Sequence, residues 1–461
     1  MHIAFFNRSF YPETAATGQF LTELCEGLSR DHGCRVSVVA GVPLIADQQG
    51  AKAKEPRERS QRPEVGGQEE KRGNERHGRI LEHENHAGIE ILRARGTRFP
   101  KAGFAGRFCN YVSYFLSACY AGLRLERPDV IVALTDPPII GLAAYLAARR
   151  FGAPLVMSYQ DIFPEAGRLL DDFHSRVVDR SLDEVNRFLV RSASRVVALG
   201  ETMRQKLIEG KGAERAKTLV IPLWADCSEI TPGPKRTEFS KANGLADKFV
   251  VMHSGNIGLS QGLEVLLGAA NELRHLSDLE VVFVGDGVRK AALMEQARIL
   301  RLGDKARFLP FQPKEKLTES FAAADVFVVS LKRGLAGIVV PSKLYGILAA
   351  GRPYVAAVES DCEVAQITRE YDCGLVAEPE NPKDLAEKIL LLYENRNQAL
   401  RLGENARKAA LHFDRKVGVR AYYELFRELA AEKKSEVGGR RTEVRGQKSE
   451  VGGSQKTSRK F

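Results

Sequence analysis

The sequence lacks several features that would place it in a common protein class. It has no uninterrupted apolar run of about 18 residues, so no membrane-spanning helix is expected. Its seven cysteines form no Cys-x-x-Cys pair, which fits reduced, structural thiols in a cytosol. The motif G-x-x-x-x-G-K-[S/T] is missing, which excludes P-loop kinases and ATPases. The dehydrogenase motif G-x-G-x-x-G is missing after the first apolar run, where residues 7–12 read NRSFYP.

The positive charge is concentrated in two segments. The net charge is +10, residues 433–461 hold nine Lys or Arg against three Glu, and residues 51–79 hold nine against six. The remaining chain is almost neutral and offers no basic face for DNA or RNA. Both segments are polar and rich in glycine, and the tail repeats a unit of the type SEVGGRR. Such sequence buries too little apolar surface to offset the entropy of ordering, so we expect disorder over 46–80 and 433–461.

Short β-branched runs alternate with amphipathic stretches along the rest of the chain. This alternation predicts parallel sheets that are covered by helices on both faces. The expected strands are 2–7, 35–41, 88–94, 129–134, 153–159, 195–199 and 219–223, then 249–253, 280–284, 307–310, 325–331 and 353–358. We therefore predict an α/β protein of two tandem Rossmann-like, doubly wound domains with a ligand cleft between them.

The expected domain boundaries follow from a break in this alternation. Residues 227–248 contain Thr231-Pro232-Gly233-Pro234, show no clear periodicity and are predicted to form a linker. The first domain is then 1–226 and the second 249–412. A helix over 413–432 is expected to cross back and brace the first domain.

Residues 327–353, FVVSLKRGLAGIVVPSKLYGILAAGRP, are the most informative stretch of the chain. They predict a strand, a Gly-rich loop and a helix, with Ser342 as its N-cap and Gly351 as its C-terminal stop. A helix start attracts anions through its free N–H groups and its dipole, and no Asp or Glu lies between residues 325 and 359. The stretch therefore predicts a diphosphate site. Its expected residues are Lys332, Arg333, Pro341, Ser342 and Lys343.

Other loops of the second half also follow predicted strands. The carboxyl ends of parallel strands meet at one edge of a sheet, and glycine lets the backbone approach a phosphate or ribose there. His253 ends a buried strand and is expected to be a packing residue rather than a base. The further residues predicted to bind a nucleotide donor are Ser254, Gly255, Asn256, Gly258, Gly285, Asp286, Gly287 and Gln312.

The order of these motifs resembles a known family. S-G-N-I-G with Q-G-L-E, F-V-G-D-G, A-A-A-D-V, and P-S-K-L with L-A-A-G-R-P look like the donor domain of a family 4 glycosyltransferase with the GT-B fold. F-Y-P-E-T, T-G-Q-F and Q-D-I-F-P-E in the first half are similar to its bacterial fucosamine and colanic-acid branch. The resemblance runs from Met1 to about Ala430 outside the inserted segment. It implies retaining sugar transfer from a nucleotide-diphosphate sugar, without a metal or another cofactor.

The resemblance also implies roles for single residues. Lys343 at the helix start would stabilise the leaving diphosphate, so we predict that it is catalytic. Lys332 and Arg333 could equally be solvated loop cations. Two family glutamates fall at Ile338 and Gly346 and are absent here. Gln261 stands where relatives often carry a basic residue, and it is predicted to be donor-binding.

Residues of the first half complete the predicted site. The backbone of Gly18 could approach the donor diphosphate, and Gln160 takes the place of a sugar-contacting His in relatives. Asp161, the second predicted catalytic residue, or Glu165 could orient or deprotonate the acceptor hydroxyl. The alternative for Asp161 is an N-cap of the following turn.

A basic, aromatic stretch near residue 110 is the predicted acceptor side. Arg107, Tyr111, Tyr114 and Phe115 could lie on an anionic membrane and present a lipid-linked acceptor. The alternative is an amphipathic helix packed on the first sheet, and we expect the helix to serve both purposes.

The predicted function is sugar transfer from a nucleotide sugar to a lipid-linked acceptor in the synthesis of a bacterial surface polysaccharide. We expect a cytoplasmic protein, peripheral on the inner face of the cytoplasmic membrane, with no nucleic-acid partner. The alternatives are a non-catalytic nucleotide-sugar-binding protein, suggested by the missing glutamate pair, and a nucleotide-sugar epimerase.

Overall fold

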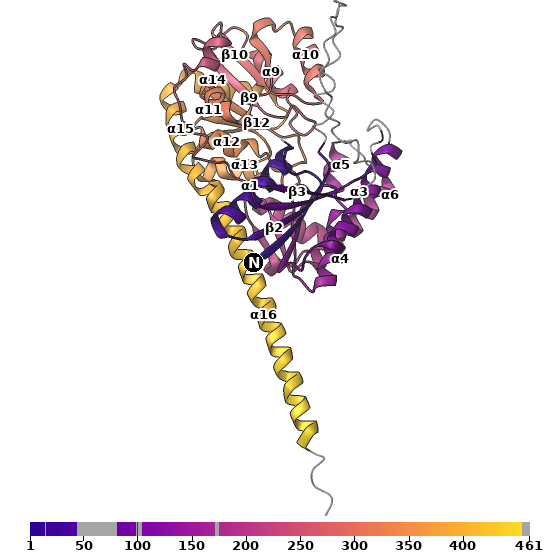
Figure 1. Cartoon of the computed structure of the whole chain (residues 1–461). Helices are drawn as coiled ribbons and strands as arrows, with labels where there is room; N and C mark the ends of the chain where they lie inside the picture. The colour runs from indigo at the N-terminus through magenta and orange to yellow at the C-terminus, as the bar shows by residue number, and fades with distance from the viewer. Residues whose placement is uncertain (14, 44–80, 98, 100–103, 171–174, 454–461) are drawn as a thin grey trace, which may run out of the picture. The chain divides into compact units, whose positions relative to one another are not determined.

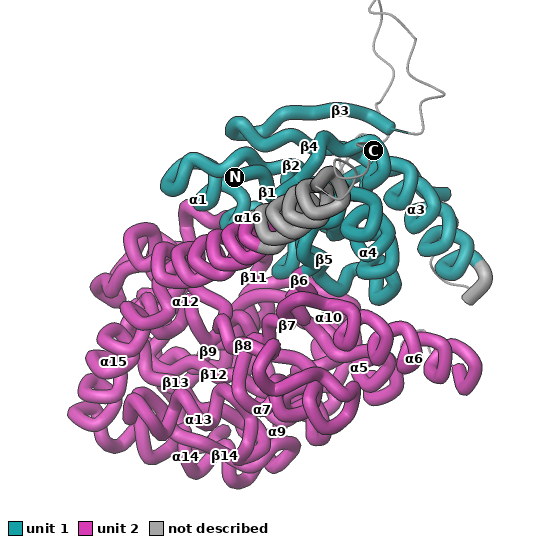
Figure 2. Tube along the Cα trace, turned by 90° about the horizontal axis from the view of Figure 1, so that it is seen from below, with its two compact units in different colours: residues 1–155 teal, residues 156–461 magenta. Residues whose placement is uncertain are grey.

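The structure, a computed structural model, describes residues 1–13, 15–43, 81–97, 99, 104–170 and 175–453. The segment 46–80, predicted to be disordered, lies outside these residues. The chain divides into two compact units, Met1–Leu155 and Val156–Phe461, which Figure 2 colours separately. This division differs from the predicted boundary at 227–248, which stays a prediction.

The first unit is built on strands in the order β3-β4-β2-β1-β5, of which Figure 1 labels β2 and β3. All neighbours are parallel except β3 and β4. The strands are β1 His2–Phe6, β2 Arg35–Gly41, β3 Leu81–His86, β4 Ile89–Ala94 and β5 Val130–Ala133. The helices are α1 Ala16–His32, α3 Phe104–Arg124 and α4 Ile140–Phe151. The sequence prediction missed β3, because this edge strand, LEHENH, is polar and largely exposed.

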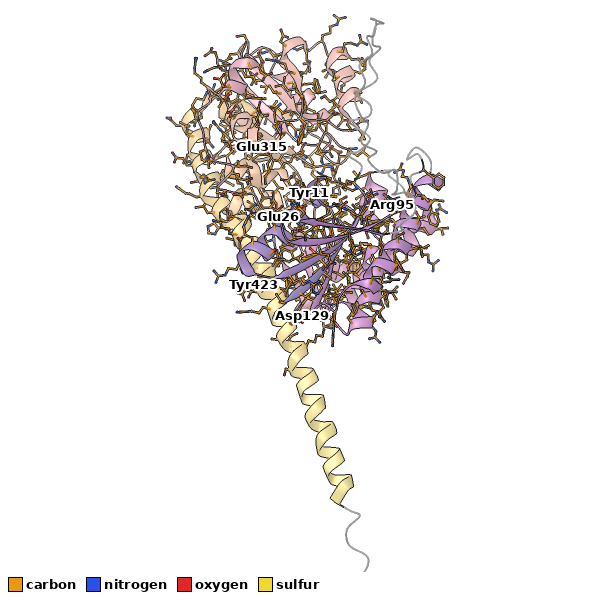
Figure 3. The ribbon with its side chains drawn as sticks, in the orientation of Figure 1. Tyr11, Glu26, Arg95, Asp129, Glu315 and Tyr423 are labelled. Carbon is orange, nitrogen blue, oxygen red and sulfur yellow. The ribbon has the colours of Figure 1, made fainter. Side chains whose placement is uncertain are left out.

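A polar contact ties α1 to this edge of the sheet. The ring of His86 stacks on Tyr11 with centroids 3.6 Å apart, and its Nε2 lies 2.8 Å from Glu26 Oε1. Figure 3 labels Tyr11 and Glu26. The helix ends at Gly33, whose φ of +61° lets its N–H return to Leu28 and Ser29 carbonyls.

The second unit begins with three parallel strands in the order β6-β7-β8. They are β6 Leu155–Ser158, β7 Arg195–Ala198 and β8 Thr218–Val220. The helices among and after them are α5 Glu165–Leu169, α6 Arg176–Ser192, α7 Glu201–Lys206, a π-helical turn Leu207–Lys211, and α8 Glu238–Ala242. Helix α8 falls inside the predicted linker, where Thr237 and Ser240 form a capping box that periodicity does not reveal.

A six-stranded, fully parallel sheet follows, in the order β11-β10-β9-β12-β13-β14. The strands are β9 Phe249–Ser254, β10 Leu279–Val284, β11 Ala306–Leu309, β12 Val326–Ser330, β13 Tyr354–Ala357 and β14 Leu375–Ala377. The helices are α9 Glu264–Glu272, α10 Lys290–Ile299, α11 Leu317–Ala322, α12 Lys343–Ala349, α13 Glu363–Glu370, α14 Pro382–Glu394 and α15 Arg396–Ala410. The prediction of two parallel α/β sheets is confirmed, although β14 was missed.

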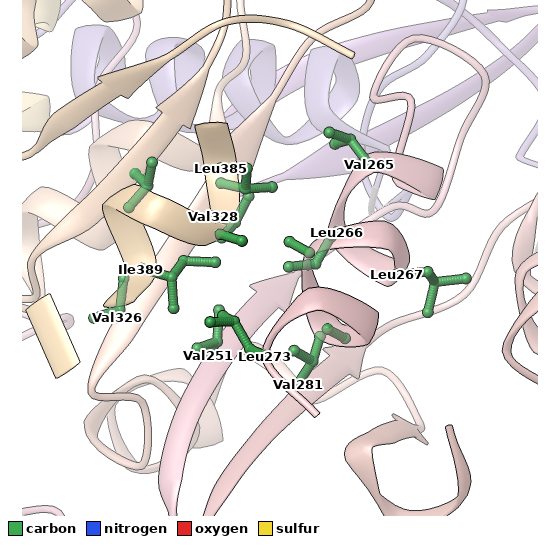
Figure 4. Packing of buried hydrophobic residues seen from close by; sticks show 14 of the residues in the cluster. Val251, Val265, Leu266, Leu267, Leu273, Val281, Val326, Val328, Leu385 and Ile389 are labelled. Carbon is green, nitrogen blue, oxygen red and sulfur yellow. The ribbon is translucent and has the colours of Figure 1, made fainter. Parts of the chain in front are cut away.

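The core of this sheet lies beneath α9 and α14. Leu266 of α9 and Ile389 of α14 pack over Val251 and Val328 of the strands (Figure 4). Asn381 caps α14 by accepting a hydrogen bond from the Asp384 N–H, and Pro382 occupies its first turn. These local signals explain why the periodic pattern predicted the second half well.

The last helix, α16 Arg415–Gly453, packs against β6 and β7. The hydroxyls of Tyr422 and Ser158 lie 2.8 Å apart, and Arg195 pairs with Glu428 and Glu432. The helix continues to Gly453, where we expected a disordered tail from residue 433. The repeat contains Glu, Lys and Arg, which are good helix formers, beside its glycines, which are poor ones. None of the helices in the part of the chain that the structure describes is both long and apolar enough to cross a membrane.

Candidate active site

Two of the predicted donor loops are joined through their backbones. The Gly255 N–H donates to the Val284 carbonyl at 2.9 Å, and the Ile257 N–H donates to the Asp286 carbonyl at 2.8 Å. Gly285 has a φ of +148°, and a Cβ there would stand 2.0 Å from the Gly255 oxygen. Only glycine allows this approach, so the loops after β9 and β10 form one rigid surface.

Gln261 and Ser330 hold the loop after β9 in place. The side-chain Oε1 of Gln261 accepts a hydrogen bond from the Gly258 N–H at 2.8 Å. The main-chain carbonyl of Gln261 accepts one from the Ser330 hydroxyl at 2.6 Å. The Lys332 N–H donates to the Ser260 carbonyl at 2.9 Å. Gln261 therefore orders the loop with its side chain, rather than holding that amide free for a ligand.

The other polar residues predicted to bind the nucleotide sugar lie on these loops and on the loop after β11. The Asp286 carboxylate accepts from the Gly287 N–H at 2.8 Å, and the exposed Asn256 approaches Gly287 closely. Gln312 donates from Nε2 to the Pro310 carbonyl at 3.0 Å. The predicted residues of the first three loops are thus brought together at the carboxyl ends of β9, β10 and β11.

Two cations reach this surface: Lys290, whose Nζ donates to the Gly285 carbonyl at 2.9 Å, and the predicted residue Lys343. A Cβ on Gly255 would lie 3.0 Å from Lys343 Cε, and no hydrogen bond or ion pair of the Lys343 ammonium occurs among the described residues. Burial lowers the pKa of Lys343 to about 8. A half-buried ammonium without a counter-charge is costly, and a bound anion would offset that cost.

Ser342 occupies the predicted N-cap position but does not cap the helix with its side chain. Ser342 does precede α12, but its side chain makes no capping hydrogen bond, because its backbone is already helical with φ −61° and ψ −22°. Gly351 ends the helix in the left-handed conformation, at φ +64°, as predicted.

Arg333 does not join Lys343. Its Nη2 donates to the Pro379 carbonyl at 3.1 Å, and it lines a hollow of about 490 Å³ with Glu359, Asp361 and Asp384. Because carboxylates surround that hollow, Arg333 is badly placed for a diphosphate. Lys332 is half-buried and packs against Gly262. Although burial acts to raise it, the pKa of Glu264 is lowered, mainly by the hydrogen bond from Arg289 and less by the charge of Lys332.

The structure brings Gln160 and Asp161 to the loop after β12. Asp161 forms an antiparallel bridge with Val339, and the Ile162 N–H donates to the Ile338 carbonyl at 3.0 Å. Gln160 is buried, with Nε2 3.5 Å from the Ser158 hydroxyl. The loop that Asp161 contacts at Val339 leads directly into Lys343, so the two residues lie on neighbouring parts of the fold although they are far apart in sequence.

Glu165 is not free to act as a base. Both of its carboxylate oxygens accept from Lys211 Nζ, at 2.7 and 2.8 Å, and the same ammonium donates to Asp183 at 2.6 Å. Lys211 is only 1% exposed. This cluster holds α5, α6 and the π-helical turn together, so the acceptor role offered for Glu165 is corrected to a structural one.

Two carboxylates that the sequence reasoning overlooked contact this region. Glu359 Oε2 accepts from the Gly334 N–H at 2.9 Å and the Ala336 N–H at 3.4 Å. Glu363 Oε1 accepts from the Met203 N–H at 2.8 Å. No sequence signal marks them, since each contact joins residues that are distant in the chain.

Gly18 and the predicted acceptor helix belong to the first unit. Gly18 lies in the first turn of α1, against Ser9. Tyr114 is 3% exposed and packs beside Gly41 and Gly96, so it belongs to the core and cannot face a membrane. Tyr111 is half-buried under the Arg8 guanidinium, 5.4 Å from its ring centre.

Two other residues of the predicted acceptor side, Arg107 and Phe115, are half-buried rather than exposed. From residue 106 of α3 onward, the exposed large apolar side chains are Phe108, Leu116, Tyr120 and Leu123.

Metal-binding and acid–base candidates are few. Within the described ranges, no cluster of three or more His, Cys, Asp or Glu could hold a metal ion. His253 is fully buried, and burial, together with the Lys343 charge, lowers its pKa to about 3. It therefore stays neutral, which agrees with its predicted packing role.

The chain matches two families along most of its length. "Glycosyl transferases group 1" matches residues 235–409 and "Glycosyl transferase 4-like domain" matches residues 16–224. The Pseudomonas aeruginosa protein named "Probable glycosyltransferase WbjE" is 31% identical over 311 residues, 65% of this chain and 74% of that protein. The Escherichia coli K12 protein named "Putative colanic acid biosynthesis glycosyl transferase WcaI" is 29% identical over 275 residues, 58% of this chain and 66% of that protein.

The crystal structure of Anabaena Alr3699/HepE in complex with UDP superposes with a TM-score of 0.66 at 18% identity. The match covers 93% of this chain and 100% of that one, which shows a shared fold. The chain is therefore a glycosyltransferase of family 4, with the GT-B fold.

Proposed function

We propose that this glycosyltransferase moves a sugar from a nucleotide-diphosphate sugar to a lipid-linked acceptor in bacterial polysaccharide synthesis. The transfer would retain the anomeric configuration and need no metal, as the resemblance to family 4 implies. Similarity to WbjE supports sugar transfer, and similarity to WcaI supports the polysaccharide context and the colanic-acid side of the predicted branch.

The observation that carries the proposal is the placement of Lys343. Among the described residues its ammonium has no hydrogen-bond or ion-pair partner, and its Cε would lie 3.0 Å from a Cβ on Gly255. The ammonium of Lys343 would stabilise the negative charge of a donor diphosphate bound there, without a cation from solution. Charge on the diphosphate grows as the sugar–phosphate bond breaks, so this contact strengthens toward the transition state.

The acceptor part of the proposal uses the outer face of α3. Phe108, Leu116 and Tyr120 are exposed at helical spacing, and Arg124 lies over the Tyr120 ring, 4.8 Å from its centre. A helix that exposes apolar and aromatic residues beside arginine can lie in the headgroup region of an anionic membrane. A lipid-linked acceptor would be met there.

The test is calorimetric titration of UDP, GDP, dTDP and ADP in the presence of EDTA. We expect one diphosphate to bind the wild type and to bind Lys343→Ala at least tenfold more weakly, since a charge-assisted contact is lost. Lys316→Ala, which removes an exposed lysine outside the site, is the matched control.

Binding that requires added Mg²⁺ would contradict the metal-free mechanism. If none of the four diphosphates binds the wild type, the predicted donor site is wrong and a degenerate, non-catalytic protein is favoured. Equal affinity in wild type and Lys343→Ala would show that the donor site lies elsewhere.

A further inference from the structure

The segment between β12 and α12 connects the two predicted catalytic residues. It runs from Leu331 to Ser342 and meets Asp161 at Val339, and α12 begins with Lys343. Leu335, Ala336 and Ile338 are buried, so the segment has a defined place in the fold. Whatever holds it also sets Asp161 relative to Lys343.

Glu363 sits at the contact between this segment and α7. Its side chain is 3% exposed, and its Oε1 accepts from the Met203 N–H in the first turn of α7. A Cβ on Gly200 would stand 1.9 Å from Glu363 Cγ. The residue before α7 is therefore glycine because the glutamate occupies the space that a side chain would need.

The segment rests directly on the turn that Glu363 holds. Gly337, at φ +65°, lies so close to α7 that a Cβ would come 2.7 Å from Thr202 Cγ2. Thr202 also accepts from Gln366 Nε2 at 2.9 Å and donates to the Asp361 carbonyl. The next residue of the segment, Ile338, accepts the Ile162 N–H at 3.0 Å.

We propose that Glu363 is a positioning residue for sugar transfer. It holds the start of α7 against Gly337, and this contact places the Ile338–Val339 backbone that supports Asp161. Glu363 touches neither predicted ligand group, and the hydrogen bonds that join the loops after β9 and β10 do not involve it. Its loss should therefore slow turnover while leaving donor affinity intact. This inference rests on the proposed roles of Asp161 and Lys343.

The experiment compares Glu363→Ala, Glu363→Gln and the wild type, using the nucleoside diphosphate and nucleotide sugar selected by the calorimetric panel. Glutamine can still accept the Met203 N–H, whereas alanine cannot. We expect kcat to fall roughly tenfold or more in Glu363→Ala, because a misplaced catalytic group is costly, and to recover largely in Glu363→Gln. The diphosphate Kd should stay within about twofold in both. Glu370→Ala, at the exposed end of the same helix, is the control.

Amide hydrogen exchange tests the positioning itself, independently of activity. Exchange at Met203 and across 337–339 should accelerate in Glu363→Ala but not in Glu370→Ala. Unchanged exchange would overturn the inference, even if the proteins proved inactive. An unchanged kcat, or a loss of diphosphate affinity parallel to the loss of kcat, would overturn it as well. A wild type that binds no diphosphate would instead contradict the proposed function, with the exchange result still deciding the role of Glu363.

Discussion

At the scale of single residues, the charge state of Lys343 controls the expected behaviour of the site. Burial lowers its pKa to about 8, so the free protein holds a proton there below that pH and releases it above. The unfolded chain still binds this proton, since a lysine in water titrates near 10.4. Stability of the ligand-free protein should therefore rise as pH rises from about 8 toward 10.

Diphosphate binding should show the opposite trend. Binding uses the protonated lysine, so affinity is expected to fall above about pH 8, by up to roughly tenfold for each pH unit. In Lys343→Arg the guanidinium stays charged, and affinity should be nearly constant between pH 7 and 9. Calorimetry at pH 7, 8 and 9 measures both profiles. A wild-type profile as flat as that of the arginine variant would contradict the assignment.

At the scale of elements, the π-helical turn Leu207–Lys211 depends on a buried cation. Lys211 forms ion pairs with Glu165 and Asp183, and Asp183 forms a second ion pair with Arg187. Burial acts to raise the pKa of Asp183, but its hydrogen bonds from Lys211 and Arg187 lower it. Lys211→Met would leave two carboxylates beside an apolar chain. We expect a loss of about 3 kcal/mol in the free energy of unfolding.

Urea unfolding measures this loss, and a surface pair is the matched control. Lys217 pairs with Glu214 at 2.9 Å but is 40% exposed, so Lys217→Met should cost less than about 1 kcal/mol. Similar effects of the two substitutions would show that the buried cluster adds nothing specific.

The glycine surface is a second element with a sharp expectation. Gly285→Ala would push a methyl group onto the Gly255 carbonyl and strain a backbone at φ +148°. We expect loss of diphosphate binding and destabilisation by more than about 2 kcal/mol. Gly303 has a φ of +52° and open space around its Cα, so Gly303→Ala should cost about 1 kcal/mol and leave binding unchanged. Denaturation and calorimetry on both variants check this.

At the scale of the whole molecule, the proposal requires a membrane-binding face. Leu116 on α3 is 61% exposed, and Leu400 on α15 is 67% exposed. If α3 binds lipid, Leu116→Glu should weaken cosedimentation with phosphatidylglycerol vesicles at least fivefold, because a carboxylate is costly to place among anionic headgroups. Leu400→Glu should have no such effect.

The net charge of +10 adds a salt-dependent contribution to the same experiment. Raising the salt concentration should weaken binding of both variants, since screening acts on all exposed charges. Equal binding of the two glutamate variants at every salt concentration would mean that charge alone holds the protein to vesicles and that α3 is not the contact.

Particular residues show how far sequence reasoning reached. The strands predicted at 35–41 and 249–253 are found, because buried strands between two helical layers are continuous apolar runs. The glycines of the donor loops were foreseen because strand ends converge at one edge of a sheet. Strand β3 was missed because an edge strand need not be apolar. The predicted membrane position of Tyr114 is wrong, because helical spacing shows which residues share a face of a helix but not whether protein or solvent covers that face.

The sequence by itself determined the fold class, the family and the position of Lys343 at the start of a helix, since these depend on local periodicity and on short motifs. Only the tertiary structure decided which charges pair. It placed Glu165 on Lys211, turned Arg333 away toward Pro379, and brought Glu359 and Glu363 against a loop that contains no acid of its own. Such pairs are made between residues far apart in the chain, and neither spacing nor propensity carries information about contacts that form only when the sheets have folded.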